Sequence, residues 1–124
     1  DDVALQIDLA DGIKLSVDAV QIQQVLINLI RNAVDAMQES PRKTLRIATI
    51  ATDGAFEMRV EDSGHGIPAD MADRLFDSFV SSKPDGMGIG LSVSRTIVEA
   101  HDGHIAATNR ETGGARFCVT LPLA

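Results

Sequence analysis

With 124 residues the chain has the length of one domain, and its 44% hydrophobic and 23% charged residues are mixed as in a globular protein, which excludes a disordered chain. A net charge of −7 and the lack of Trp and Tyr exclude nucleic acid as a partner, because phosphate binding needs clustered Lys and Arg. No apolar run approaches a membrane span, and the one cysteine, Cys118, excludes an internal disulfide, so we expect a cytoplasmic domain without direct membrane contact.

Alternating apolar and polar residues predict two hairpins, each with an Asp-Gly pair that is typical of a type I′ turn. The predicted pairs are 3–10 with 13–18 and 44–51 with 55–61. Two further strands are predicted near the end of the chain, in "HIAATN" and "ARFCVTLPL". Six strands in pairs favour a mostly antiparallel sheet.

Three helices are predicted, over residues 19–38, 69–79 and 90–103. Asp18 is the expected N-cap of the first, whose apolar residues recur at i, i+3, i+4 and i+7, and Gly103 is expected to end the last. The order ββ-α-ββ-α-α-ββ predicts an α+β fold, a two-layer α/β sandwich with a mixed, mostly antiparallel sheet and three helices on one face. Residues 77–89 form an irregular segment long enough to be a functional loop.

The first predicted helix carries a polar strip beside its apolar stripe. Gln24, Asn28, Asn32 and Asp35 fall at i, i+4, i+8 and i+11. A solvated face would account for the strip, although Asn is a poor helix former. Alternatively, these side chains supply the oxygen ligands that Mg²⁺ accepts together with phosphates and water.

Two glycine-rich turns follow. In "EDSGHGI", Asp62 ends a strand just before Gly64 and Gly66, and it either starts an Asx-turn or accepts a hydrogen bond from an exocyclic amine of a flat base.

In "GMGIGL", Gly86, Gly88 and Gly90 lead into a helix whose free N–H groups favour an anion, and Lys83 is near enough to reach a terminal phosphate. Taken alone, a flexible linker explains this second turn equally well. It is neither a Walker A loop nor a dinucleotide loop.

No two of the three histidines, His65, His101 and His104, stand at i, i+4 spacing, and His101 and His104 flank a predicted helix end, so we expect structural roles for them. No Ser/His/Asp or Cys/His arrangement of a nucleophile is apparent.

Four segments in register resemble the N, G1, F and G2 boxes of the catalytic, ATP-binding domain of sensor histidine kinases, in the gyrase and mismatch-repair ATPase superfamily. They are "QIQQVLINLIRNAVDAM", "VEDSGHGIP", "LFDSFVSSK" and "GMGIGLSVSRTIVEAHDGHI". The stretch from Ser81 to Gly103 further resembles the oxygen-sensor and nitrogen-regulatory subgroups. The resemblance implies a Bergerat-type ATP-binding fold over residues 1–124. Because the chain begins with Asp1 rather than Met, we expect it to be a piece of a longer protein.

The resemblance implies ATP and Mg²⁺ as ligands. Asn32 would ligate Mg²⁺, Asn28 and Lys83 would lie near the γ-phosphate, and Asp62 would accept from the adenine amino group. Phe76 and Phe79 would anchor a mobile lid over the nucleotide. The full set of expected nucleotide-binding residues is Asn28, Asn32, Asp35, Asp62, Gly64, Gly66, Ile67, Phe79, Lys83, Gly86, Gly88, Gly90 and Leu91.

Hydrolytic relatives and anti-sigma-factor serine kinases carry Glu where this chain has Asn28, and Asn cannot act as a general base. The resemblance therefore implies transfer of the γ-phosphoryl group to a histidine on a separate dimerisation domain, and from there to a response regulator. Of the three histidines only His101 is followed by an acidic residue, Asp102, and it lies within the segment that resembles the G2 box, so the acceptor is expected on the separate domain. The alternatives are a nucleotide sensor without transfer and a serine kinase, which Asn28 disfavours.

Overall fold

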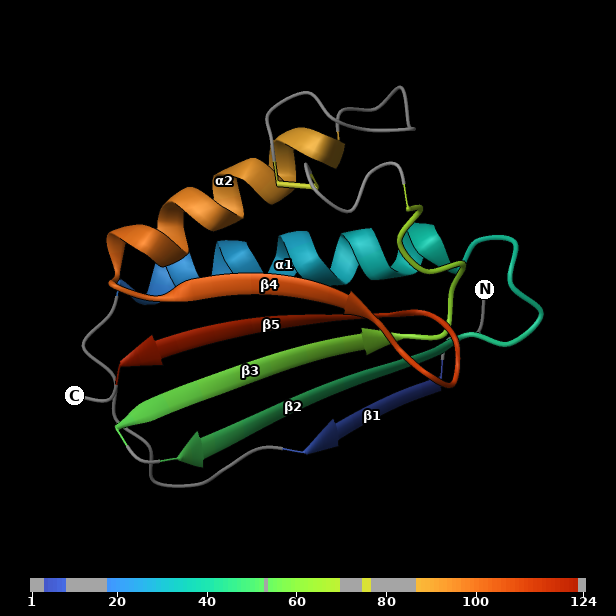
Figure 1. Cartoon of the computed structure of the whole chain (residues 1–124), viewed down its shortest axis with the longest axis horizontal. Helices are drawn as coiled ribbons and strands as arrows, with labels where there is room; N and C mark the ends of the chain where they lie inside the picture. The colour runs from blue at the N-terminus through green and yellow to red at the C-terminus, as the bar shows by residue number, and fades with distance from the viewer. Residues whose placement is uncertain (1–3, 9–17, 53, 70–74, 77–86, 123–124) are drawn as a thin grey trace.

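The computed structural model describes residues 4–8, 18–52, 54–69, 75–76 and 87–122. In this part of the chain, helices α1 (Ala19–Ala36) and α2 (Met87–Ala100) cover one face of a five-stranded sheet (Figure 1). The strands are β1 (Ala4–Asp8), β2 (Thr44–Thr52), β3 (Ala55–Asp62), β4 (His104–Asn109) and β5 (Ala115–Pro122). Their order is β1-β2-β3-β5-β4, and only the β1–β2 pair is parallel. The predicted two-layer sandwich with a mixed, mostly antiparallel sheet is confirmed.

One predicted hairpin is observed and the other falls largely outside the described residues. Strands β2 and β3 pair from Leu45 opposite Asp62 to Thr52 opposite Ala55, and Gly54 in their turn has φ +74°. The expected partner strand of β1, 13–18, lies almost wholly outside the described residues. Strand β1 pairs with β2 in parallel, with Leu5 opposite Leu45. The sequence did not predict this pairing, because it joins segments that are far apart along the chain.

Helix α1 begins as predicted. The Asp18 side chain accepts a hydrogen bond from the backbone N–H of Gln21 at 3.1 Å, which satisfies one of the free N–H groups of the first turn. The predicted end at residue 38 is two residues too long, since Met37 is the C-cap. The buried side chains of the helix are Val25, Leu29, Ala33 and Met37, the spacing of one apolar face.

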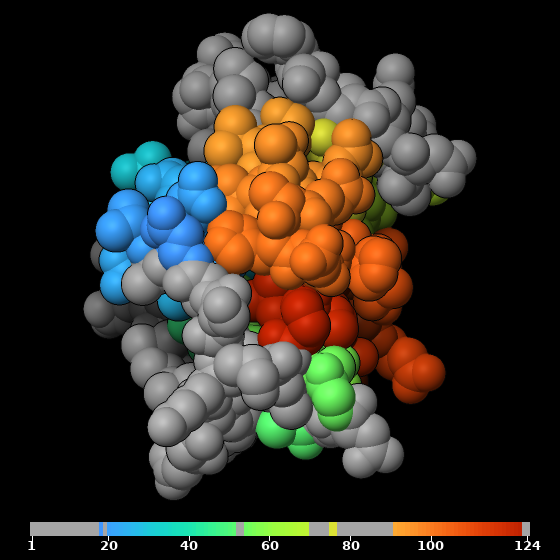
Figure 2. Space-filling model, turned by 90° about the vertical axis from the view of Figure 1, so that its left-hand side faces the viewer, coloured from blue at the N-terminus to red at the C-terminus, as the bar shows by residue number. Residues whose placement is uncertain are grey.

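The core lies between this face and the sheet. Phe117, Val119 and Leu121 of β5 are at most 2% exposed, and Met58 and Val60 of β3 pack beside them. Helix α2 adds Leu91 and Val98. Figure 2 shows α2 lying beside the start of α1 and above β5. Among the described residues, no helix has the length and hydropathy to cross a membrane.

Helix α2 begins at Met87, three residues before the predicted start, so Gly88 and Gly90 belong to its first turn. The prediction was wrong because glycine disfavours a helix by about 1 kcal/mol relative to alanine, whereas packing of Leu91 and Val98 in the core outweighs this local cost. Residues 87–89 are therefore not part of an irregular segment. The rest of the predicted loop, 77–86, and most of the predicted helix 69–79 lie outside the described residues.

The end of α2 also differs from the prediction. The helix ends at Ala100, and the residue with left-handed backbone is Asp102, with φ +61°, rather than Gly103. Asp tolerates this conformation better than most side chains. Gly103 meets a different requirement, because a Cβ atom there would lie 2.3 Å from the main-chain oxygen of Thr120 on β5. Gly103 thus permits close packing of the helix end on the sheet.

His101 joins the end of α2 to the start of α1. Its Nε2 accepts the N–H of Asp18 at 3.1 Å, and its Nδ1 lies 2.8 Å from the carbonyl oxygen of Ile97. Since Nε2 accepts, the ring proton is on Nδ1 and is donated to Ile97. The predicted structural role is confirmed for His101. The contact of His65 is local, with its Nδ1 2.6 Å from the carbonyl oxygen of the adjacent Gly66, so its structural role stays a prediction.

Candidate functional site

Asp62 lies at the end of β3 and is fully buried. Its Oδ1 accepts the backbone N–H of Gly64 at 2.8 Å and of Ala115 at 3.3 Å. Its Oδ2 is buried as well, and no hydrogen-bond donor reaches it from the described part of the chain. A buried acceptor without a donor costs about 1–3 kcal/mol. The arrangement therefore suits a ligand that brings its own N–H donor to Oδ2.

Burial raises the pKa of the Asp62 carboxyl, and the hydrogen bonds from Gly64 and Ala115 offset only part of that effect. The ionised form is thus less favourable in the folded protein than in water. An N–H donor at Oδ2 would stabilise the carboxylate, because hydrogen bonds to charged groups are the stronger kind. The site gains most from a donor that arrives with a ligand.

The turn after Asp62 packs against the end of α1, and its glycines are needed there. A Cβ atom at Gly64 would lie 2.4 Å from the main-chain oxygen of Ala36, the same oxygen that accepts the N–H of His65 at 3.3 Å. Gly66 has φ +80°, a conformation that side chains rarely adopt. Both positions therefore require glycine, and the predicted contacts of Gly64 and Gly66 with a nucleotide stay predictions.

The turn between β4 and β5 contacts the main-chain oxygen of Asp62 through Arg110 and Gly114. Arg110 Nη1 donates to the main-chain oxygen of Asp62 at 2.8 Å. Gly114 has φ +86°, and a Cβ atom there would lie 1.9 Å from the same oxygen. In the sequence, residues 110–114 only separate the last two predicted strands. The Gly-Gly pair was the available signal that a close approach occurs here.

The polar strip of α1 is not simply a solvated face. Asn28 is only 8% exposed. Its Nδ2 donates to Ser94 Oγ on α2 at 3.2 Å, and its Oδ1 accepts from Gln24 Nε2 at 3.0 Å. Ser94 is fully buried and was not predicted, because a lone serine in an apolar helix gives no signal. Asn28 therefore connects the two helices, and its proximity to a phosphate stays a prediction.

Asn32 and Asp35 lie further along α1, and both are half-buried. Within the described residues the Asn32 side chain makes no hydrogen bond. Its amide oxygen suits Mg²⁺, which binds one or two protein oxygens and completes its shell with phosphate and water. The described residues contain no cluster of three or more His, Cys, Asp or Glu that could hold a metal.

The remaining predicted residues fall into three groups. Ile67 and Phe76 are half-buried against the core, where the Phe76 ring meets Phe117 edge to face at 6.1 Å and 83°. Leu91 is 4% exposed and belongs to the core itself. Phe79, Lys83 and Gly86 lie outside the described residues, so their predicted contacts with nucleotide stay predictions.

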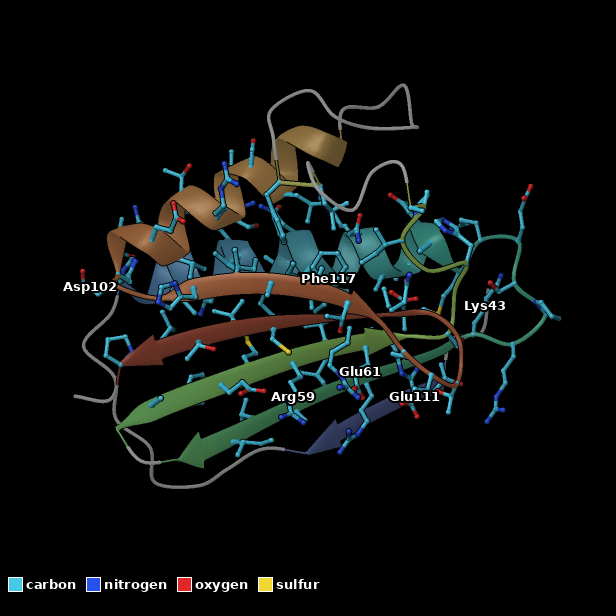
Figure 3. All side chains as sticks on the ribbon, viewed as in Figure 1. Lys43, Arg59, Glu61, Asp102, Glu111 and Phe117 are labelled. Carbon is cyan, nitrogen blue, oxygen red and sulfur yellow. The ribbon has the colours of Figure 1, made fainter. Side chains whose placement is uncertain are left out.

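Glu61, labelled in Figure 3, follows the core residue Val60 on β3 and is 3% exposed on the face of the sheet away from the helices. Arg46 Nη1 lies 3.1 Å from its Oε1, and Arg116 Nε is bonded to its Oε2. Burial alone would raise the pKa of Glu61, but the two arginines outweigh it, so the pKa is lowered. This ion-pair group joins β2, β3 and β5 directly beside Asp62.

A cavity of about 560 Å³ lies between the loop after α1 and the β4–β5 turn. Asp62 does not line it. Its lining residues are Ser40, Pro41, Arg42, Thr44, Ser63, Gly64, Arg110, Thr112 and Gly113. The buried carboxylate and this cavity are therefore separate features of the same end of the sheet.

Residues 17–124 match the family described as histidine kinase-, DNA gyrase B-, and HSP90-like ATPase. The chain belongs to this ATPase family. The predicted resemblance is confirmed, and relatives of this ATPase domain include sensor histidine kinases. Over 98% of the chain it is 47% identical to the sensor protein FixL of Bradyrhizobium diazoefficiens, and over 86% it is 46% identical to the C4-dicarboxylate transport sensor protein DctS of Rhodobacter capsulatus. It spans 25% and 16% of the lengths of these two proteins.

Solved catalytic domains of histidine kinases share the fold. The nucleotide-free catalytic domain of ThkA superposes with a TM-score of 0.86 at 31% identity, over 97% of this chain and 78% of that one. Full-length ShkA in complex with AMPPNP gives a TM-score of 0.84 at 25% identity, over 98% of this chain and 26% of that one. In this ATPase domain, the buried Asp62 and the polar strip of α1 thus lie on a histidine kinase scaffold.

Proposed function

We propose that this histidine kinase ATPase domain binds Mg²⁺-ATP and donates the γ-phosphoryl group to a histidine on a separate dimerisation domain. The observation that carries the proposal is the buried Oδ2 of Asp62, which lacks a donor in the described part of the chain. The adenine amino group is a donor of the right kind, and the similar ShkA was solved with AMPPNP. In the guanine ring a carbonyl takes the place of this amino group, and the carboxylate would repel it.

At the phosphate end, Asn32 is the proposed Mg²⁺ ligand. The cation would neutralise phosphate charge as the phosphoryl group moves. Asn28, Asp35 and Lys83 are proposed to lie near the phosphates, and Gly86, Gly88 and Gly90 to let the backbone approach them. The two glycines in the first turn of α2 support this, since N–H groups at a helix N-terminus are free to bind an anion.

Asn28 decides between transfer and hydrolysis. An amide cannot take a proton from water, so the position lacks the general base that hydrolytic relatives have there. Its bonds to Gln24 and Ser94 also hold it in a buried helix contact. In the proposed reaction an acceptor histidine nitrogen attacks the γ-phosphorus, the bond to the bridging oxygen breaks, and ADP leaves.

The proposed partners are the acceptor-histidine domain of the same protein and, through it, a response regulator, with the cytoplasm as the proposed compartment. A nucleotide sensor that binds ATP without transfer is the second candidate. It is favoured by the same buried Asp62, because base recognition does not require transfer.

Radiolabelled ATP tests this proposal. The chain alone is expected to acquire no label and to release little phosphate, whereas a mixture with the acceptor-histidine domain is expected to label that domain. The acceptor domain alone serves as the control. Acid-stable label on the chain would indicate a serine kinase, and brisk phosphate release without acceptor would indicate an ATPase. An unlabelled mixture, despite nucleotide binding, would favour the sensor.

A further inference from the structure

Asn109, the last residue of β4, is bonded to the far end of the turn that follows Asp62, at Ile67. Its Oδ1 accepts the backbone N–H of Ile67 at 2.6 Å, and its Nδ2 donates to the carbonyl oxygen of Ile67 at 3.2 Å. One side-chain amide thus satisfies both main-chain groups of a residue 42 positions away. A paired contact of this kind fixes orientation as well as distance, since the amide is planar.

The neighbouring geometry is fitted to this contact. A Cβ atom at Gly66 would lie 2.8 Å from Asn109 Oδ1, so the backbone approaches the amide as closely as glycine allows. The next residue, Arg110, donates to the main-chain oxygen of Asp62 at 2.8 Å. Two consecutive residues therefore hold the turn at both ends, at Asp62 and at Ile67.

We propose that Asn109 is a positioning residue for the nucleotide base. It fixes Gly66 and Ile67 relative to the Asp62 carboxylate, so that the base is met by a preformed surface. The inference rests on the proposed function, since it concerns the same site. Asn109 is exposed and acts through the turn, without needing to touch the nucleotide itself. Without the Asn109 side chain, the turn would have to become ordered when the nucleotide binds. The entropy cost of this ordering would weaken the affinity for the nucleotide.

The test compares Asn109→Ala with Thr108→Ala, an exposed position on the same strand and the opposite face of the sheet. Asn109→Ala is expected to weaken Mg²⁺-ATP binding by about tenfold, while Thr108→Ala binds like the parent. With the acceptor domain supplied, KM for ATP should rise and kcat at saturating ATP should stay unchanged. Amide hydrogen exchange at Ile67 should accelerate in Asn109→Ala.

A merely structural role would lower the midpoint of thermal unfolding but leave the affinity unchanged below that temperature, and this result would overturn the inference. Asn109→Asp keeps an acceptor for the Ile67 N–H and loses the donor, so its affinity should fall between the parent and Asn109→Ala. If Asn109→Ala does not fold, affinity of Asn109→Asp equal to the parent overturns the inference. Absence of nucleotide binding by the parent chain would refute the proposed function, whereas binding that is indifferent to Asn109 refutes this inference alone.

Discussion

Asp62→Asn is expected to weaken Mg²⁺-ATP binding by about a hundredfold or more. An asparagine at this position must still present an oxygen to the N–H groups of Gly64 and Ala115. Its NH₂ group then takes the place of Oδ2 and faces the adenine amino group, so that two donors meet. Isothermal titration with Mg²⁺-ATP measures the loss, and affinity equal to the parent would contradict the assignment of Asp62.

The same substitution is expected to preserve or increase the stability of the nucleotide-free domain at neutral pH. Burial raises the pKa of Asp62 in the folded state, so the folded state binds the proton more tightly than the unfolded chain does. The free energy of unfolding therefore falls as the pH rises from the unfolded pKa of about 3.9 toward the raised folded pKa. Asparagine does not titrate, so the variant should not lose stability in this way. Its midpoint of thermal unfolding should therefore vary less between pH 4 and 8 than that of the parent.

Glu61→Gln provides the matched control, because its carboxyl is shifted in the opposite direction. Its pKa is lowered in the folded state, since Arg116 and Arg46 outweigh the effect of burial. Its contribution to stability is present above the unfolded pKa and is lost as the pH falls through the folded pKa. Glu61→Gln should therefore destabilise the domain at neutral pH. Equal stability losses for both variants would show that Asp62 is an ordinary structural carboxylate.

Gly114→Ala is expected to destabilise the domain by more than about 3 kcal/mol, enough to unfold a marginally stable fold. Its backbone has φ +86°, and the added Cβ would lie 1.9 Å from the main-chain oxygen of Asp62. Relief would require the turn to move away from β3, which would also break the bond from Ala115 to Asp62. Urea unfolding of the purified variants provides the measurement.

Gly113→Ala separates the two causes. Gly113 has φ +101°, but nothing lies within 4 Å of a Cβ atom placed there. It should cost only the backbone strain, about 1 kcal/mol. The difference in the free energy of unfolding between the two variants then measures the cost of the steric clash with the main-chain oxygen of Asp62. Equal losses would mean that the turn relaxes without cost.

The residues that were found from the sequence act through local chemistry. Asp62, Gly64 and Gly66 were predicted from a carboxylate at a strand end followed by spaced glycines, and the bond from the Gly64 N–H to Asp62 Oδ1 is the Asx-turn that this pattern also allowed. Asp18 was predicted as an N-cap because Gln21 follows three residues later, a capping-box arrangement, and the bond from the Gln21 N–H to its side chain confirms the cap. Local patterns also gave the antiparallel hairpin and the apolar face of α1.

The residues that were missed act through strand pairing and helix packing. Asn109 and Arg110 reach the turn after Asp62 because β3 pairs with β5 and β5 with β4, a register that only the folded sheet defines. Ser94 became recognisable only once α2 was placed beside α1. The start of α2 was misplaced because core packing outweighs the low helix propensity of Gly88 and Gly90.

The central claim is that the buried Asp62 carboxylate accepts a hydrogen bond from the adenine amino group. Parallel calorimetric titrations of the parent chain with Mg²⁺-ATP and Mg²⁺-GTP test this claim. GTP presents a carbonyl oxygen where ATP presents this donor, and Oδ2 would then remain unpaired at a cost of about 1–3 kcal/mol. We expect ATP to bind and GTP to bind at least about tenfold more weakly. Equal affinities for the two nucleotides, or binding of neither, would contradict the assignment.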